Sequence, residues 1–201
     1  QRRDKNAVVT EHENAPVVPY QTVMNRQITD EDQWQRVSAT GTFDAEHQLL
    51  ARYRSNDGLT GWEVVTPLRA SDGRVVLVSR GFAERNLKED FPKVLPSPPS
   101  GEVTVIGNVR RNEVGKDTAT VPQFGSVRLI SSIHIEEWLG EPLVNGYIGL
   151  LTVDPPQTGE LMPVRPPELS EGPHFWYAVQ WFMFTALAGA ERIFDILDSP
   201  G

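Results

Sequence analysis

A chain of 201 residues can bury one substantial hydrophobic core, or at most two small ones. Its formal net charge of -8 and its pI near 5.0 argue against a nucleic-acid partner, because binding to a phosphate backbone needs clustered Lys and Arg. The chain has no cysteine, which excludes disulfides, zinc ribbons, iron–sulfur clusters and thiol catalysis.

Residues 1–33 are polar and are interrupted by Pro16 and Pro19, which favours a lead-in that precedes the folded domain. Residues 29–32 fit an acidic turn or a helix start. The chain begins at Gln1 with neither a starting methionine nor an apolar stretch of the signal-peptide type. We therefore expect a further segment before Gln1 in the complete protein.

A β-rich region begins at Trp34. Apolar and β-branched residues predict strands over 35–43, 48–53, 61–68 and 74–82. The tripeptide at residues 71–73, Ser-Asp-Gly, is a strong hairpin signal between the last two of these strands. Together the four strands suggest an antiparallel meander.

Proline then interrupts the pattern at residues 92–99, and strict alternation predicts a half-buried strand over 102–110. A polar loop follows up to residue 123. Residues 133–139 have helical spacing, with Ser131 or Ser132 as the N-cap and Gly140 as the stop. A last strand is predicted over 147–153, before an extended proline-rich stretch. Residues 34–171 are thus expected to form one α+β domain dominated by antiparallel strands.

Residues 172–190 form the most informative segment of the chain. The stretch from 173 to 190 carries no charge and is crowded with aromatic side chains at its beginning. It is slightly shorter than the roughly 20 apolar residues that cross a bilayer, and Trp and Tyr favour the headgroup layer. We predict a C-terminal transmembrane helix here, with an acidic tail over 191–201. The alternative is a helix packed on a water-soluble core.

Helical spacing places His174 on the same side of this segment as Tyr177 and Trp181, close to the predicted lipid boundary. Neutral imidazole is a good axial ligand for haem iron, and aromatic rings provide an apolar wall for a porphyrin. His174 is therefore the candidate metal ligand. Trp176, Tyr177 and Trp181 either line such a wall or serve only as interfacial belt residues.

Several motifs, in this order, resemble the Surfeit locus protein 1 family of cytochrome c oxidase biogenesis factors. The most specific are the Val-Thr-Pro-Leu and Arg-Gly-aromatic strings. The matching segments cover residues 35–37, 41–43, 65–68, 78–82, 105–110, 174–178 and 181–182. Two asparagines commonly precede the histidine in the family, where this chain has Gly172 and Pro173, and Ser79 stands where an asparagine is common. The tail at 191–198 is acidic and amphipathic, whereas members of the family continue the apolar helix and end it with basic residues.

The resemblance implies a β-rich extracytoplasmic domain between two transmembrane helices, of which the N-terminal one is missing from this sequence. It places the protein in the cell membrane or the mitochondrial inner membrane. It further implies that haem a is bound through His174 and delivered to oxidase subunit I. The partners would be cytochrome c oxidase subunits, a respiratory supercomplex and the lipid membrane.

Arg80 directly precedes Gly81 at a strand end. Its fork of donors suits a haem propionate or a partner's carboxylate, and it equally suits an internal structural pair. The other histidines, His12, His47 and His134, are expected to be solvated, or in the case of His134 to serve as a cap. The glycines at 41, 61, 81 and 107 are expected at bulges and turns.

No catalytic set is visible in the sequence, which has no nucleophile elbow of the Gly-x-Ser-x-Gly type, so the protein is not expected to be an enzyme. Two functions compete. The first is a haem-handling assembly factor, and the second is an accessory subunit that binds the oxidase or a supercomplex without holding haem. A weaker third is an unrelated β-domain that binds envelope polysaccharide or another protein.

Overall fold

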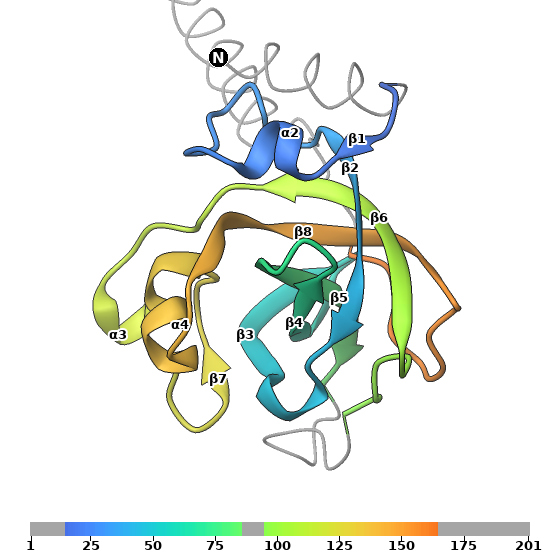
Figure 1. Ribbon diagram of the computed structural model, residues 1–201. Helices are drawn as coiled ribbons and strands as arrows, with labels where there is room; N and C mark the ends of the chain where they lie inside the picture. The colour runs from blue at the N-terminus through green and yellow to red at the C-terminus, as the bar shows by residue number, and fades with distance from the viewer. Residues whose placement is uncertain (1–14, 86–94, 165–201) are drawn as a thin grey trace, which may run out of the picture. The chain divides into compact units, whose positions relative to one another are not determined.

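Strands dominate the part of the chain that the computed structural model describes, which is residues 15–85 and 95–164 (Figure 1). These residues fall in the first of two units, Gln1–Pro166 and Pro167–Gly201. The strands are β1 (Val18–Pro19), β2 (Arg36–Phe43), β3 (Leu49–Asn56), β4 (Leu59–Ala70), β5 (Val75–Glu84), β6 (Glu102–Arg110), β7 (Ser126–Val127) and β8 (Leu143–Asp154). The helices are α2 (Gln21–Met24), the 3-10 turn η1 (Ala45–His47), α3 (Asp117–Thr120) and α4 (Ser132–Leu139).

Five of the strands close into a barrel. The pairing runs from β2 to β6, β8, β5 and β4, and a further pairing of β2 with β4 closes the ring. β3 and then β7 extend the sheet beyond β4, while β1 lies beside β2. Figure 1 shows β6 and β8 crossing above β4 and β5, with α3, α4 and β7 beside β3. The prediction of a β-rich domain is confirmed.

The predicted meander is wrong at its first step, because β2 does not pair with β3. Both strands instead lie along one edge of β4. The end of β2 pairs with β4 through Gly41 and Ala70, and β3 pairs with it from Leu49 opposite Val65 onward. Between them, η1 turns the chain at residues 45–47. This bend frees the rest of β2 to pair with β6 and so allows the barrel to close.

The sheet is also not wholly antiparallel. β5 and β8 run parallel, as do β1 with β2 and β3 with β7. Parallel neighbours need a long connection, and the chain between β5 and β8 contains β6, α3, β7 and α4. The alternation of apolar and polar residues predicts each strand by itself, but it does not predict that the chain returns after β6, α3, β7 and α4 to pair β8 with β5.

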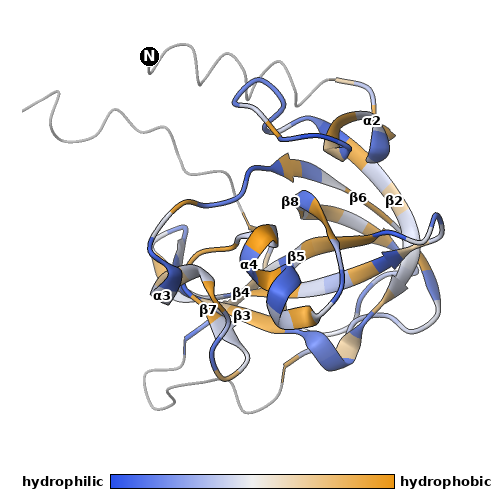
Figure 2. Cartoon of the chain, turned by 60° about the vertical axis from the view of Figure 1, so that its left-hand side comes forward, coloured by the Kyte–Doolittle hydropathy of each residue, from blue (hydrophilic) through white to orange (hydrophobic). Residues whose placement is uncertain are grey.

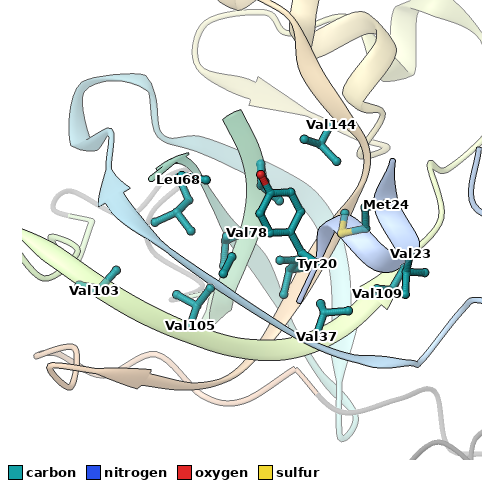
Figure 3. Packing of buried hydrophobic residues seen from close by; sticks show 14 of the residues in the cluster. Tyr20, Val23, Met24, Val37, Leu68, Val78, Val103, Val105, Val109 and Val144 are labelled. Atoms are coloured by element: carbon teal, nitrogen blue, oxygen red, sulfur yellow. The ribbon is translucent and has the colours of Figure 1, made fainter. Parts of the chain in front are cut away.

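Apolar side chains from all five barrel strands fill the interior (Figure 3), with valines from β2, β5, β6 and β8 and Leu68 and Ala70 from β4. One end of the barrel is covered by the segment before β2, where Tyr20, Val23, Met24 and Ile28 are buried with the strand side chains. The Tyr20 hydroxyl donates to Asp72 Oδ2 in the β4–β5 turn at 2.6 Å. This segment therefore contributes four side chains to the core, although the sequence predicts a polar lead-in up to residue 33.

A second apolar cluster lies on the outer side of β3, β4 and β5. It contains Leu49, Val65, Leu77 and Tyr147 and is covered by Ile135 of α4, with Val127 and Ile130. β5 is consequently buried on both faces from Val75 to Phe82. β2 and β6, by contrast, are banded in alternating colours in Figure 2, because apolar and polar residues alternate along them.

Local signals in the sequence predict several elements well. β6 spans the predicted residues 102–110. The turn at 71–73 closes with hydrogen bonds between Ala70 and Arg74 and from the Gly73 N–H to the Ala70 carbonyl. Gly140 ends α4 with a φ of 77°. The polar loop up to residue 123 differs from the prediction, since it contains α3, whose Ala119 carbonyl accepts two backbone hydrogen bonds.

Among the helices in residues 15–85 and 95–164, none is both long and apolar enough to cross a membrane. The predicted transmembrane segment at 172–190 lies outside the described residues.

Candidate functional site

Arg80 occupies a β-bulge in β5. Val64 pairs with Gly81 and Val65 pairs with Ser79, so Arg80 is the extra residue. Such a bulge redirects a side chain, and Arg80 is only 2% exposed. Gly81 has a φ of 149°, and a Cβ there would lie 2.8 Å from the Leu161 Cβ. The bulge therefore depends on glycine at position 81.

Four neutral acceptors surround the Arg80 guanidinium. Nε donates to Thr66 Oγ1 at 2.9 Å, and Nη1 donates to Gln157 Oε1 at 3.1 Å. Nη2 donates to Gln48 Oε1 at 2.7 Å and to the Pro96 carbonyl. In return, Gln157 Nε2 donates to the Arg80 carbonyl at 3.0 Å. The side chain thus ties β5 to residues before β3, in β4, before β6 and after β8.

The Arg80 charge has no carboxylate partner within the described ranges. Burial lowers the pKa of the guanidinium to about 10, because a charged group loses hydration there. It still carries its charge at neutral pH. The ring of Phe43 lies 5.9 Å from the guanidinium carbon. Chemically, this is a buried cation held by dipoles and one aromatic face, and not an ion pair.

A second buried polar group lies around Arg54 of β3. Arg54 binds Glu113 with two hydrogen bonds of 2.9 and 2.7 Å, and its Nε is 3.4 Å from Glu63 Oε1. Ser79 donates to the other Glu63 oxygen at 2.9 Å, and the Ile130 N–H donates to Glu113 at 2.6 Å. The Arg54 pKa is raised, because although burial lowers it, the bond to Glu113 and the charge of Glu63 outweigh that effect.

Arg110 lies between two aromatic rings. Its guanidinium carbon is 4.0 Å from the Trp34 ring centroid and 5.9 Å from that of Tyr147. Trp34 holds a φ of 78° and donates its backbone N–H to the Val109 carbonyl at 2.8 Å. Tyr147 is 3% exposed, and its burial raises the pKa of its hydroxyl. These cation–π contacts hold the C-terminal end of β6 against Trp34 and Tyr147.

His47 belongs to a chain of polar contacts on the surface. Its Nδ1 lies 2.8 Å from Asp44 Oδ2, and its ring meets that of Trp138 edge to face at 5.9 Å. Asp44 also accepts from Arg69 at 2.9 Å, and Arg69 binds Glu141 with two hydrogen bonds. Burial raises the pKa of Asp44, but its bonds to His47 and Arg69 outweigh that effect and lower it. The prediction of a merely solvated His47 is therefore incomplete.

His134 does not cap α4, since the N-cap is Ser131. Its Nε2 lies 3.9 Å from Asp117 Oδ1, and its buried Nδ1 has no hydrogen-bond partner. Within residues 15–85 and 95–164, no three His, Asp or Glu side chains are arranged to hold a metal ion. The described domain therefore offers a structural cation at Arg80 but no metal centre.

The sequence model of the SURF1 family matches residues 1–186 of this chain. The chain belongs to the SURF1 family. This confirms the resemblance seen in the strand motifs. The SURF1 family is known in general as a family of oxidase assembly factors.

Curated relatives agree with this assignment. Uncharacterised SURF1-like proteins of Mycobacterium bovis and of Mycobacterium tuberculosis are each 32% identical to this chain over 180 residues. The match covers 87% of this chain and 65% of each relative. The chain thus matches a little less than two thirds of the length of these SURF1-like relatives.

Of the site residues predicted from the sequence, the structure of this SURF1 chain places only Arg80. His174, Trp176, Tyr177 and Trp181 lie outside the described residues.

Sequence reasoning missed Arg54, Arg110 and Trp34 as members of buried polar contacts in this SURF1 domain. One signal was present for Arg110, since the alternation of β6 places it on the less buried side next to the buried Val109. Nothing local indicated its stacking partners, because Tyr147 lies on a strand that the chain reaches much later.

Proposed function

We propose that this chain is a membrane-anchored assembly factor for haem–copper cytochrome c oxidase, which binds haem a and assists its delivery to subunit I. One observation carries the proposal. The match to the SURF1 family extends to residue 186, so it includes His174 and the aromatic residues around it.

In this proposal His174 supplies the axial imidazole, and Trp176, Tyr177 and Trp181 provide the apolar wall. The haem would supply the iron that the imidazole binds, while the helix at 172–190 would hold it at the lipid boundary. The β-rich domain would lie on the extracytoplasmic side. The protein would hold and transfer a cofactor without catalysing a reaction.

The contacts of Arg80 support a structural role for that residue. Four of the five N–H donors of the guanidinium are already bonded, so a haem propionate that bound it with two hydrogen bonds would have to displace Thr66, Gln48, Gln157 or the Pro96 carbonyl. The barrel interior beside it is filled by buried side chains such as Val78 and Leu68, which leaves no room for a porphyrin there. In this proposal the haem site therefore lies on the predicted helix at 172–190 and not in the barrel.

The competing function is an accessory subunit that binds the oxidase or a respiratory supercomplex without haem. Family membership argues against the third interpretation, an unrelated β-domain that binds polysaccharide. The accessory role and the haem-handling role share a partner and differ in the cofactor.

The decisive experiment purifies the full-length protein and records its absorbance spectrum together with an analysis of extracted haem. We expect haem a in the wild type, loss of its signal in His174→Ala, and retention of the signal in the control His12→Ala. A colourless wild-type preparation that still co-purifies with the oxidase would refute haem handling and establish the accessory role.

A further inference from the structure

The outer edge formed by β3 and β7 displays two aromatic side chains to solvent. Phe124 is fully exposed at 102%, and Tyr53 is 70% exposed. β7 runs parallel to β3, with Leu50 opposite Ser126 and Ala51 opposite Val127. Phe124 precedes this pairing and Arg128 follows it. Because four residues of extended chain span at most about 14 Å, the Cα atoms of Phe124 and Arg128 are no farther apart than that.

The backbone holds Phe124 in place on a tight turn. Gln123 and Ser126 exchange backbone hydrogen bonds of 2.9 and 3.0 Å around Phe124 and Gly125. Both central residues have positive φ, 50° and 70°, a geometry in which Asn, Asp and Gly are preferred. The Gly125 carbonyl accepts from the Leu50 N–H at 3.0 Å, which fixes the turn against β3. A large apolar side chain is thus presented to solvent from an unfavourable conformation.

Tyr53 repeats this arrangement on β3. It has a φ of 60° and lies in an irregularity, because the pairing with β4 skips from Ala51 to Arg54. The guanidinium carbons of Arg52 and Arg128 lie 5.8 and 5.1 Å from its ring centroid. Backbone conformations of this kind persist where the surroundings enforce them and gather at functional sites.

These two arginines form no ion pair with a carboxylate in the part of the chain that the structure describes, whereas Arg54 between them in sequence is paired with Glu113. Planar guanidinium groups with free donors match carboxylates in a bidentate geometry. Aromatic residues and arginine are also the side chains enriched in protein interfaces. The chemistry of this edge is therefore that of a protein contact with an acidic partner.

An anionic membrane fits less well. Attraction to anionic headgroups is only about 1 kcal/mol for each Lys or Arg near the surface, so two arginines give weak binding. Carboxylates of a protein can instead be placed to accept bidentate hydrogen bonds from both guanidiniums, which adds geometric specificity to the charge attraction.

We propose that the edge formed by Tyr53, Phe124, Arg52 and Arg128 is the surface by which this protein docks on its oxidase partner. Carboxylates of that partner pair with the two guanidiniums, and Phe124 enters an apolar recess between them. This inference rests on the proposed function, because it takes an oxidase subunit as the occupant.

The test uses the full-length tagged chain in its native membranes and measures the cytochrome c oxidase recovered with it after detergent extraction. We expect the double variant Phe124→Ser, Arg128→Glu to lower recovery at least ten-fold, about 1.4 kcal/mol. The matched controls are Leu151→Ser, at a residue 49% exposed, and Arg74→Glu, at a side chain 51% exposed. They should change recovery by less than about two-fold. Thermal unfolding of each variant confirms that it folds.

A photo-reactive residue at position 124 adds a second measurement. It should crosslink to an oxidase subunit beside an acidic residue, and reversing that acid to arginine should restore recovery with Arg128→Glu. Unchanged recovery in the folded double variant overturns the docking surface while leaving the proposed function intact. If the wild type recovers no oxidase, both fail. Loss of binding to phosphatidylglycerol vesicles with unchanged oxidase recovery would assign this edge to lipid instead.

Discussion

Replacement of Arg80 by methionine tests whether the buried guanidinium is a structural element of the barrel. Methionine has a similar length but no charge and no donors. The substitution relieves the cost of burying the charge, which the fall of the Arg80 pKa to about 10 puts at roughly 3 kcal/mol. It also removes the hydrogen bonds to Thr66, Gln157, Gln48 and Pro96.

Each hydrogen bond from a charged donor contributes about 1.5–3 kcal/mol, so the four lost bonds outweigh the relief. The two glutamine amides can partly satisfy each other after the change, which places the net loss near the lower end, at about 3 kcal/mol. In a domain of this size that loss lowers the midpoint of thermal unfolding by roughly 6–12 °C.

Calorimetry or circular dichroism of Arg80→Met measures this loss. The control is Arg74→Met, since the Arg74 side chain is 51% exposed and lies 3.9 Å from Asp72, and its effect should stay within about 0.5 kcal/mol. If Arg80→Met is as stable as the wild type, the neutral acceptors do not hold the guanidinium. The reasoning would then be refuted, and the arginine would be available to an anion from outside.

Three further predictions concern other parts of the fold. Glu113→Gln should destabilise the domain by about 3–5 kcal/mol in urea unfolding, because it leaves the buried charge of Arg54 without its main partner; a loss below about 1 kcal/mol would mean that solvent reaches the pair. Gly81→Ala should cost more than the about 1 kcal/mol expected of Gly73→Ala, because a Cβ at Gly81 meets Leu161 whereas nothing lies within 4 Å at Gly73; equal thermal shifts would contradict this. Burial raises the pKa of Asp72, but hydrogen bonds from Tyr20 and Gln21 lower it below its usual value, so this carboxylate stabilises the fold above about pH 4. The difference in thermal midpoint between wild type and Asp72→Asn should therefore shrink as the pH falls from about 7 to 3, and a constant difference would refute the assignment.

Local sequence patterns were sufficient where one element decides its own structure. The alternation at residues 102–110 is satisfied by a single strand with one buried face, and β6 spans those residues. Gly73 and Gly140 take positive φ at a turn and at a helix end, because both positions demand a conformation that glycine adopts without strain. The order of the family motifs likewise needed no structure, and the family match confirms it.

Contacts between distant segments could not be predicted in this way. Arg80 and Gln157 are 77 positions apart, and Arg54 and Glu113 are 59 apart. The sequence predicts that Tyr20 belongs to a polar lead-in, whereas in the structure its hydroxyl donates to Asp72 of the β4–β5 turn. In each pair at least one residue lies in a segment outside the strands, and the assembly of the whole sheet decides where that segment runs. A period of two residues fixes which face a strand side chain takes but not its neighbours.

The sequence by itself therefore determined the six long strands, the main turn, helix α4 and the family, because these depend on local periodicity and on strings of residues. The two-residue strands β1 and β7 were not predicted. Only the tertiary structure decided that β2 pairs with β4, and not with β3, and so closes a barrel. It also decided that Arg80 is buried at a bulge and that Tyr53 and Phe124 share an exposed edge. Those features arise from barrel closure, in which strands far apart in the chain must pair in one register, and closure is a property of the whole sheet and not of any segment.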